Sequence, residues 1–171
     1  MEIQLQPNLK KEGIFNTVKN YLKETGFTIC DSDENRPWGG FYVIDESEAQ
    51  KFIHNFFNDV QNLKQKPLGK ISPKILIVES GKRLSWQYHH RRAEVWKVIG
   101  GRVAVMTSEN DDQTDIQRKG VGDVIILEQG ARHRLIGLDT WGIVAEIWQH
   151  TDINNPSNEE DIIRVEDDFG R

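Results

Sequence analysis

Residues 81–101 read GKRLSWQYHHRRAEVWKVIGG, and they carry three side chains that can bind a metal ion. On a β-strand, residues two apart share a face, so Gln87 and His89 point to the same side. Glu94 follows after a short connection and can return to the same point from the next strand. A second glycine-bounded segment, GDVIILEQGARHRL at residues 122–135, supplies His133. The sequence therefore predicts one site built from Gln87, His89, Glu94 and His133.

Two imidazoles, a carboxylate and an amide oxygen suit a borderline to hard divalent ion. A lone histidine on a strand is more often a structural residue, but the joint spacing of the four side chains favours metal binding. We expect one divalent metal ion, with zinc as the first choice and manganese, iron, nickel or cobalt as alternatives. Four protein ligands in an open barrel would leave one or two positions for substrate oxygens.

The chain around these segments is rich in short β-type runs from Pro73 onward. Each run has about the length of one strand, and glycines punctuate the stretch: KILIVES, LSWQYHH, AEVWKVIG, RVAVMTS, DVIILE, RHRLIGL and GIVAEIWQ. Evenly spaced strands with turn signals predict an antiparallel sandwich or barrel rather than a βαβ fold. We expect this barrel and an acidic tail that wraps over its surface to occupy residues 71–171.

The first 70 residues have a different pattern and predict a helical extension that packs on the barrel. Apolar residues recur at helical spacing from Leu9 to about Gly26, and again from Ser47 to about Leu63, where Ser47 can cap the helix. Between the helices, the segment RPWGGFYVI at residues 36–44 predicts a tight turn and a short strand from Phe41 to Ile44.

Composition limits the classes of function. The 171 residues carry a formal net charge of -5, which disfavours a general nucleic-acid binder. Cys30 is the only cysteine, so no intramolecular disulfide can form, and a lone thiol fits a reducing cytoplasm. No apolar run is long enough for a membrane span or a signal core. We therefore expect a cytoplasmic protein with no nucleic-acid or membrane partner.

The two metal-ligand segments resemble the two signatures of the cupin superfamily. The first segment matches at Gly81, Gln87, His89, Glu94 and Gly101, and the second at Gly122, Gly130 and His133. Glu128 stands where proline is usual, Gln87 stands where most cupins have a first histidine, and Gly137 stands where asparagine often closes the second signature. The resemblance implies a mainly β protein, a cupin (double-stranded β-helix, jelly-roll) barrel, with one or two added N-terminal helices.

The glutamine gives a narrower resemblance, to the cupin of the type II phosphomannose isomerases. LSWQYHHRRAEVW, RHRL and EDDFGR are similar to that family's LSLQMHHHRAEHW, KHRL and EDDYGR, and an RPWG segment precedes the barrel in both. The resemblance covers about residues 35–45 and 73–171. It implies a metal-dependent aldose–ketose isomerase, with mannose 6-phosphate and fructose 6-phosphate as substrates. Val95 and Arg91 depart from the family pattern and leave the sugar open.

Candidate roles follow from these matches and from the basic residues near the predicted barrel mouth. For the catalytic group that moves the proton we consider Glu94, Glu146 and His90, in that order. Arg171, which matches the arginine of EDDYGR, is a further candidate catalytic residue and, with Arg92, could bind a phosphate at the barrel mouth. For substrate binding we consider Arg92, which matches the HRAE arginine, together with Arg134, Lys82 and Trp96, whose ring could stack on a sugar.

Alternative functions remain open at this point. Another phosphosugar isomerase or epimerase, for instance one acting on a heptose phosphate, would use the same site. A non-catalytic cupin that binds a sugar or nucleotide sugar would bind metal and ligand without turnover. An iron-dependent dioxygenase is a poorer match, because Gln87 replaces the third histidine. Since barrel cupins often pair through their outer strands, a homodimer is our expectation for the assembly.

Overall fold

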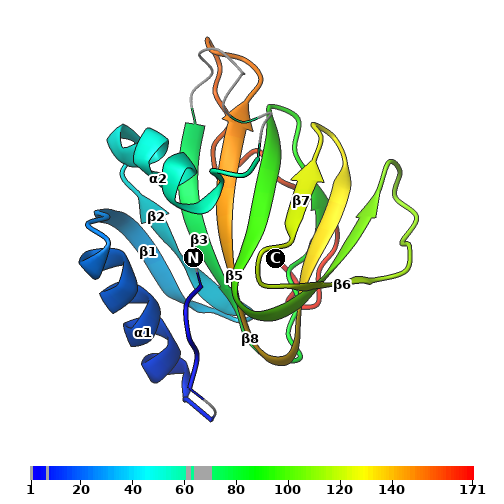
Figure 1. Cartoon of the computed structure of the whole chain (residues 1–171). Helices are drawn as coiled ribbons and strands as arrows, with labels where there is room; N and C mark the ends of the chain where they lie inside the picture. The colour runs from blue at the N-terminus through cyan, green and yellow to red at the C-terminus, as the bar shows by residue number, and fades with distance from the viewer. Residues whose placement is uncertain (1, 7, 61–62, 64–70) are drawn as a thin grey trace.

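The computed structural model describes residues 2–6, 8–60, 63 and 71–171. Two long strands form the centre of its sheet (Figure 1). β5 (Arg92–Ser108) and β8 (Arg132–His150) pair in antiparallel register from Arg92 opposite His150 to Ser108 opposite Arg132. Irregularities around Gly100 and Gly101 bend the pair. Gly101 has φ +64°, and a Cβ there would lie 2.0 Å from the carbonyl oxygen of Trp141. Glycine therefore permits the bend that curls this sheet into a barrel.

The remaining strands extend the sheet on both sides of β5 and β8. The sheet order is β1-β2-β3-β8-β4-β9, and β5 also pairs with β6 and β7. These strands are β1 (Ile29–Arg36), β2 (Gly39–Ile44), β3 (Ile71–Val78), β4 (Trp86–Tyr88), β6 (Gln117–Gly120), β7 (Val124–Leu127) and β9 (Ile163–Glu166). Figure 1 shows that they curl around a common interior. The prediction of a mainly β, antiparallel chain is confirmed.

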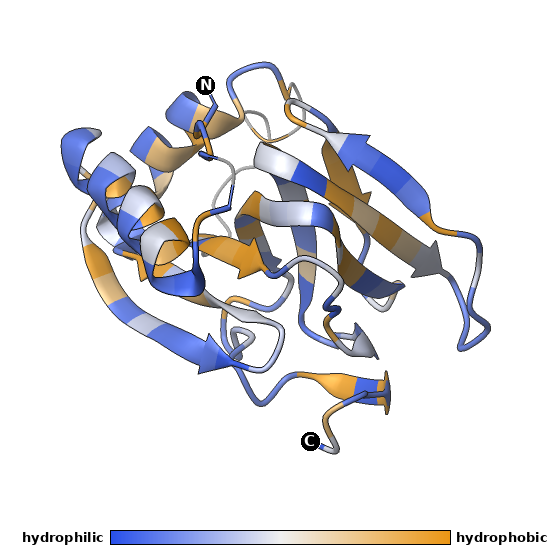
Figure 2. Cartoon of the chain, turned by 90° about the horizontal axis from the view of Figure 1, so that it is seen from below, coloured by the Kyte–Doolittle hydropathy of each residue, from blue (hydrophilic) through white to orange (hydrophobic). Residues whose placement is uncertain are grey.

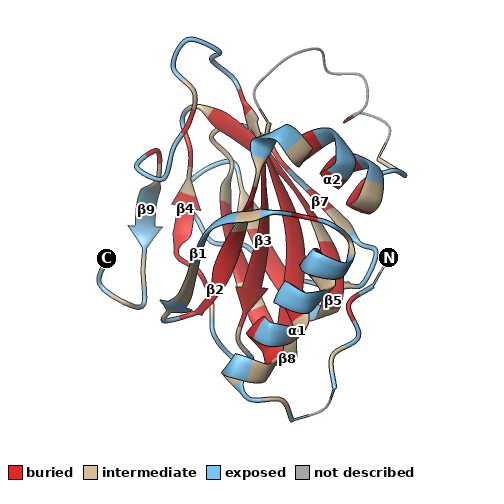
Figure 3. Cartoon of the chain, turned by 90° about the vertical axis from the view of Figure 1, so that its left-hand side faces the viewer, coloured by how far each residue is buried: buried red, intermediate tan, exposed pale blue. Residues whose placement is uncertain are grey.

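Two helices cover the outer face of the sheet (Figures 1 and 3). α1 (Lys11–Glu24) and α2 (Ala49–Phe56) turn their apolar sides inward, and Figure 2 shows hydrophilic and hydrophobic residues alternating along them. One hydrophobic cluster joins buried residues of both helices to the outer side chains of β2, β3, β5 and β8, among them Phe15, Phe52, Tyr42, Ile75, Val95 and Ile147. The added helices therefore close one side of the sheet and leave its inner face to the site.

The inner face of the sheet carries mostly apolar side chains, with polar side chains gathered at one end. A second cluster fills the barrel with side chains that alternate with those of the first: Trp38, Phe41, Leu76, Leu84, Trp96, Val98, Val103, Leu127, Leu135 and Val144. Strand alternation places Glu94 on the same side of β5 as Trp96 and Val98. Because the outer face is covered by helices and the inner face by this cluster, polar residues at one end of the interior are held away from bulk water.

The second helix differs from its prediction. α2 ends at Phe56, and a turn containing Asn58 and Asp59 separates it from Leu63, which is again helical. Asn and Asp favour turns because their short side chains compete for backbone hydrogen bonds. The predicted Ser47 cap is wrong as well, since the carboxylate of Asp45 accepts the Ser47 N–H at 2.8 Å and starts a 3-10 turn, η1 (Glu46–Glu48). Residues 61, 62 and 64–70 lie outside the described residues.

Three strands of the described chain lie outside the sequence prediction. β1 and β6 are polar and show no apolar alternation, and β9 reads IRVE, whose alternation is only four residues long and lies within an acidic tail. Conversely, runs predicted as separate strands merge into β5 and β8, because their glycines bend the strand rather than end it. Among the described residues, no helix has the length and apolar character needed to cross a membrane.

Candidate metal centre

Strand register brings the ligand residues to one place on the inner face. Gln87 of β4 lies directly opposite His133 of β8. Glu94 of β5 lies opposite Trp148, which is on the other half of β8. Opposed residues of antiparallel strands point to the same face, with Cβ atoms about 5 Å apart. The bend of β8 thus lets residues from both of its halves face the same interior.

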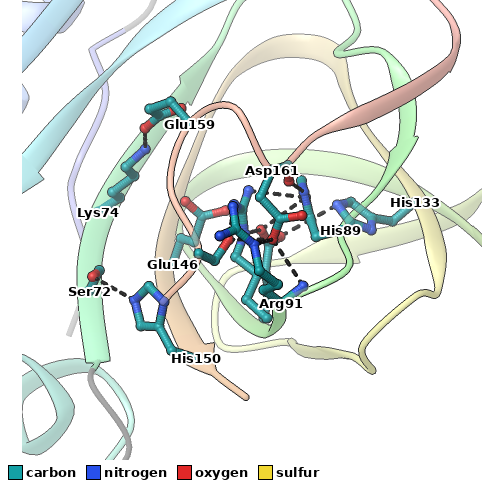
Figure 4. Close-up of polar contacts among 12 residues, drawn as sticks. Ser72, Lys74, His89, Arg91, His133, Glu146, His150, Glu159 and Asp161 are labelled. Atoms are coloured by element: carbon teal, nitrogen blue, oxygen red, sulfur yellow. Dashed lines mark hydrogen bonds and ion pairs between the residues drawn. The ribbon is translucent and has the colours of Figure 1, made fainter. Parts of the chain in front are cut away.

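Three of the four predicted ligands converge closely. One ligand atom from each of His89, Glu94 and His133 lies within 4.8 Å of the other two. His89 Nε2 is 3.2 Å from Glu94 Oε1, and His133 Nε2 is 3.4 Å from Glu94 Oε2. All three side chains are buried. Figure 4 shows the rings of His89 and His133 beside each other, and their centroids are 5.1 Å apart. Such a group of residues could hold a divalent metal ion.

The second nitrogen of each imidazole contacts a backbone carbonyl. His89 Nδ1 lies 2.6 Å from the carbonyl oxygen of Asp161, and His133 Nδ1 lies 2.9 Å from that of Ala131. A carbonyl oxygen can only accept, so each ring carries a proton on Nδ1, and in a neutral ring Nε2 then holds the lone pair that faces Glu94. Histidines that bind metals usually have this arrangement, with the remote N–H held by a carbonyl or carboxylate.

Two buried polar atoms of the cluster lack a hydrogen-bond partner. Glu94 Oε2 and His133 Nε2 face each other as two acceptors, and neither has a donor among the described residues. Leaving such atoms unsatisfied in the interior costs about 1–3 kcal/mol each. A divalent cation would satisfy both lone pairs at once. The donor set of two imidazoles and a carboxylate therefore fits a metal ion.

Charge around Glu94 favours its ionised form. Burial alone would raise the pKa of Glu94, but the neighbouring His89 and Arg92 lower it well below its ordinary value. Arg92 Nε donates to Glu94 Oε1 at 2.7 Å, and its guanidinium lies 3.6 Å over the Trp148 ring. Burial lowers the pKa of His133 to about 4. A neutral imidazole beside a carboxylate is the protonation state that metal binding requires.

Gln87, the fourth predicted ligand, is buried beside this group. Its Oε1 accepts a hydrogen bond of 2.5 Å from the Ser85 hydroxyl. Gln87 and Glu94 both line one cavity. Glu94 therefore belongs both to the three-residue cluster and to the wall of this cavity. The structure brings the predicted fourth ligand to the site, and its amide oxygen is held by Ser85.

A second carboxyl group faces the same cavity. Glu146 is 4% exposed, and its Oε1 accepts a hydrogen bond of 2.9 Å from Trp96 Nε1. Burial raises the pKa of Glu146 to about 8, and the negative charge of Glu94 adds to this, while Lys74 and Arg92 oppose it. Trp96 also packs edge-on against His133, with ring centroids 5.4 Å apart. A buried carboxyl group that exchanges a proton near neutral pH thus lies beside the candidate ligands.

The other predicted residues divide between the cavity and the rest of the molecule. Lys82 and His90 are exposed and do not line the cavity. Arg134 is fully buried outside the cavity, where both terminal nitrogens donate to Glu166. Arg92 lines the cavity, but its N–H groups already contact Glu94, Ser157, His89 and the Asn158 carbonyl. Arg171 lines the cavity at its rim.

The sequence analysis missed several residues at the site. Asp161 is 6% exposed, and its carboxylate accepts the backbone N–H groups of His90 and Arg91, both at 3.0 Å. Lys74 lies opposite Glu146 in register and pairs with Glu159. Arg164 lies opposite Gln87 and lines the cavity. Only the period-two pattern of IRVE could have indicated one of them, because the other contacts join segments far apart in sequence.

Comparison with solved structures identifies the fold. The oxalate decarboxylase of Bacillus subtilis, described with Mn(II) centres, is 14% identical to this chain, with a TM-score of 0.56 over 81% of this chain and 32% of that chain. A cupin 2 conserved barrel domain protein from Salinispora arenicola is 21% identical, with a TM-score of 0.40 over 46% of this chain and 62% of that chain. This chain thus spans about a third of the decarboxylase. The predicted cupin fold is confirmed.

Comparison of sequences identifies the family more narrowly. The sequence model described as mannose-6-phosphate isomerase C-terminal matches residues 64–167, more than half of the chain. The match includes Gln87, His89, Glu94, His133 and Glu146. No curated protein matches the chain in sequence.

Proposed function

Because the chain belongs to the mannose-6-phosphate isomerase C-terminal family, we propose that it is a metal-dependent isomerase of a phosphorylated sugar. The reaction would interconvert an aldose phosphate and its ketose phosphate, with mannose 6-phosphate and fructose 6-phosphate as the first pair to test. The donor set supports zinc as the first metal to supply, followed by manganese, iron, nickel and cobalt.

The observation that carries this proposal is the position of Glu146 beside the metal-ligand cluster. Aldose–ketose isomerisation moves a proton between two neighbouring carbons through an enediol. The reaction needs a group that stabilises negative charge on oxygen and a separate group that takes and returns the proton. Glu94 and Glu146 line one cavity, and they carry charge to different extents because their pKa values are shifted in opposite directions. Such a separation supports different roles for two nearby carboxyl groups.

The surrounding side chains supply the other requirements. A bound divalent metal would polarise the substrate carbonyl and stabilise the charge that develops on its oxygen. Trp96 Nε1 fixes Glu146 Oε1, so that the remaining carboxyl oxygen is the one that exchanges the proton. Arg92 orients Glu94 and also contacts His89 Nε2 at 3.1 Å, which makes it a positioning residue. The buried rings of Trp96 and Trp148 limit the entry of water.

The test is an isomerase assay on the full chain with zinc, manganese, iron, nickel or cobalt supplied in turn. We expect turnover of mannose 6-phosphate, and a panel of other aldose phosphates, including a heptose phosphate, identifies the sugar. Glu146→Gln keeps the shape of the side chain but cannot accept the proton, so kcat falls about 100-fold or more. Metal binding by Glu146→Gln stays at the level of the parent. Absence of turnover with every sugar and metal, with metal bound, would refute the proposal.

A further inference from the structure

Three arginines from separate parts of the chain meet at the rim of the cavity. Arg36 ends β1, Arg164 lies in β9 and Arg171 is the last residue, and all three line the cavity that contains Glu94. Convergence of cationic side chains from three segments is unfavourable unless counter-charges or a ligand compensate it. It therefore matters which guanidinium groups of these arginines are paired with carboxylates.

Carboxylates compensate this charge only in part. Arg171 contacts Asp167 through Nε at 3.0 Å and Nη2 at 2.8 Å. Arg36 Nε lies 2.9 Å from Asp33 Oδ2, and its two terminal nitrogens have no hydrogen bond within the described residues. No side-chain hydrogen bond or ion pair engages Arg164 in the described part of the chain.

Arg164 lies close to this group of charges. Burial lowers the pKa of the Arg164 guanidinium, the like charges of Arg171 and Arg36 lower it further, and the carboxylates of Asp167 and Glu159 oppose this. Glu159 also lines the cavity, but its carboxylate contacts Lys74. The rim therefore has guanidinium N–H donors on Arg36 and Arg164 that no hydrogen bond or ion pair within the described residues engages.

Strand register fixes where this cluster lies relative to the metal ligands. His133, Gln87 and Arg164 form a row across β8, β4 and β9, because Gln87 is opposite both of the others. Residues in such a row share a face, and each step is one strand spacing of about 4.8 Å. Arg164 therefore begins two strands from His133 on the inner face. This separation suits a sugar whose carbonyl end is at the metal ligands and whose far end carries an anion.

We propose that Arg36, Arg164 and Arg171 form the binding subsite for a dianionic phosphate monoester. Guanidinium groups recognise phosphate through paired N–H donors, which gives both charge and orientation. The subsite would hold the phosphate of the substrate and orient its carbon chain toward Glu94, so this inference rests on the proposed isomerase function. Of these three arginines only Arg171 is among the sequence candidates, and the predicted substrate-binding residues Arg92, Arg134, Lys82 and Trp96 are not part of this subsite.

Phosphate binding tests the subsite separately from catalysis. Inorganic phosphate is titrated into the metal-free full chain at constant ionic strength, and binding is followed by calorimetry. Because a hydrogen bond to a charged group is lost, Arg164→Gln and Arg171→Gln should each weaken binding about tenfold or more. Arg118→Gln is the matched control, since Arg118 is an exposed arginine on β6 outside the cavity, and it should bind as the parent does. Undetectable phosphate binding by the parent, or unchanged binding by Arg164→Gln, would overturn the proposal.

Kinetics then separate failure of the subsite from failure of the proposed function. With a phosphosugar that the parent converts, Arg164→Gln should raise KM about tenfold or more and change kcat much less. An equal KM for Arg164→Gln and the parent would count against the subsite while leaving the isomerase intact. Arginine-dependent phosphate binding by a parent that converts no phosphosugar would refute the isomerase while supporting the anion subsite.

Discussion

Replacement of Asp161 by alanine should destabilise the protein strongly, although Asp161 lies in the C-terminal tail. Its carboxylate accepts hydrogen bonds from the backbone N–H groups of His90 and Arg91, both at 3.0 Å, and from the Ser157 hydroxyl at 2.6 Å. Even at the low end of about 1.5 kcal/mol for a bond to a charged group, three bonds predict a loss of roughly 4.5 kcal/mol. Asp152→Ala is the control, because Asp152 is exposed and accepts two tail N–H groups that water can satisfy.

Chemical denaturation of the metal-free variants measures this loss. Burial alone would raise the pKa of Asp161, but its hydrogen bonds from Ser157 and the two amides outweigh burial and lower it. The contribution of Asp161 to stability is therefore present above the ordinary carboxyl pKa and is lost as the pH falls. Asp161→Ala should lack this acid-dependent loss. A destabilisation below about 1 kcal/mol, or one equal to that of Asp152→Ala, would refute the reasoning.

The same substitution should weaken metal binding. The carbonyl oxygen of Asp161 holds His89 Nδ1 at 2.6 Å, and its side chain fixes the loop that follows His89. Loss of a group that orients a metal-binding histidine typically lowers metal affinity about 10–100-fold. Competition with a zinc chelator at neutral pH measures the change for Asp161→Ala against Asp152→Ala. Equal zinc affinity of both variants would show that the tail does not orient His89.

Two further predictions concern Glu146 and Gly137. Because the pKa of Glu146 is raised from 4.5 to about 8, stability of the metal-free protein should fall as the pH rises through this range and level off above it. Glu146→Gln should flatten that fall in denaturation curves, and an unchanged pH dependence would contradict the buried, protonated carboxyl group. Gly137→Ala should cost about 2–3 kcal/mol, since a Cβ there would lie 2.0 Å from the Glu79 carbonyl oxygen. Gly120→Ala, with no atom within 4 Å of its Cβ, should change the unfolding free energy by less than about 0.5 kcal/mol, and equal effects would refute the steric argument.

Local spacing predicted much of the candidate site. Gln87 and His89 are two residues apart on one strand, so strand geometry alone places them on one face. Glu94 and His133 could be added because each lies in a glycine-bounded strand segment of a similar kind. The departure at Gly137 also has a structural reason, because the backbone near Glu79 leaves no room for the asparagine that often closes the second signature. The convergence of His89, Glu94 and His133 agrees with this prediction.

Long-range contacts explain what the sequence could not predict. The tail was expected to cover the surface, but β9 adds a strand beside β4 and brings Arg164 next to Gln87. The IRVE pattern of β9 is too short to indicate which strand it pairs with. Arg92 resembled a substrate-binding arginine, and its burial against Glu94 and Ser157 depends on the fold of residues far along the chain.

Metal stoichiometry tests the central claim most directly. The parent, His133→Ala and His90→Ala are stripped of metal, dialysed against the same low concentration of zinc and analysed for bound zinc per chain. His90 is the matched control, because it is an exposed histidine near the cluster that does not line the cavity. We predict one zinc ion per chain for the parent and for His90→Ala, and a large loss for His133→Ala. Equal zinc content in His133→Ala and the parent would contradict a metal centre formed by His89, Glu94 and His133.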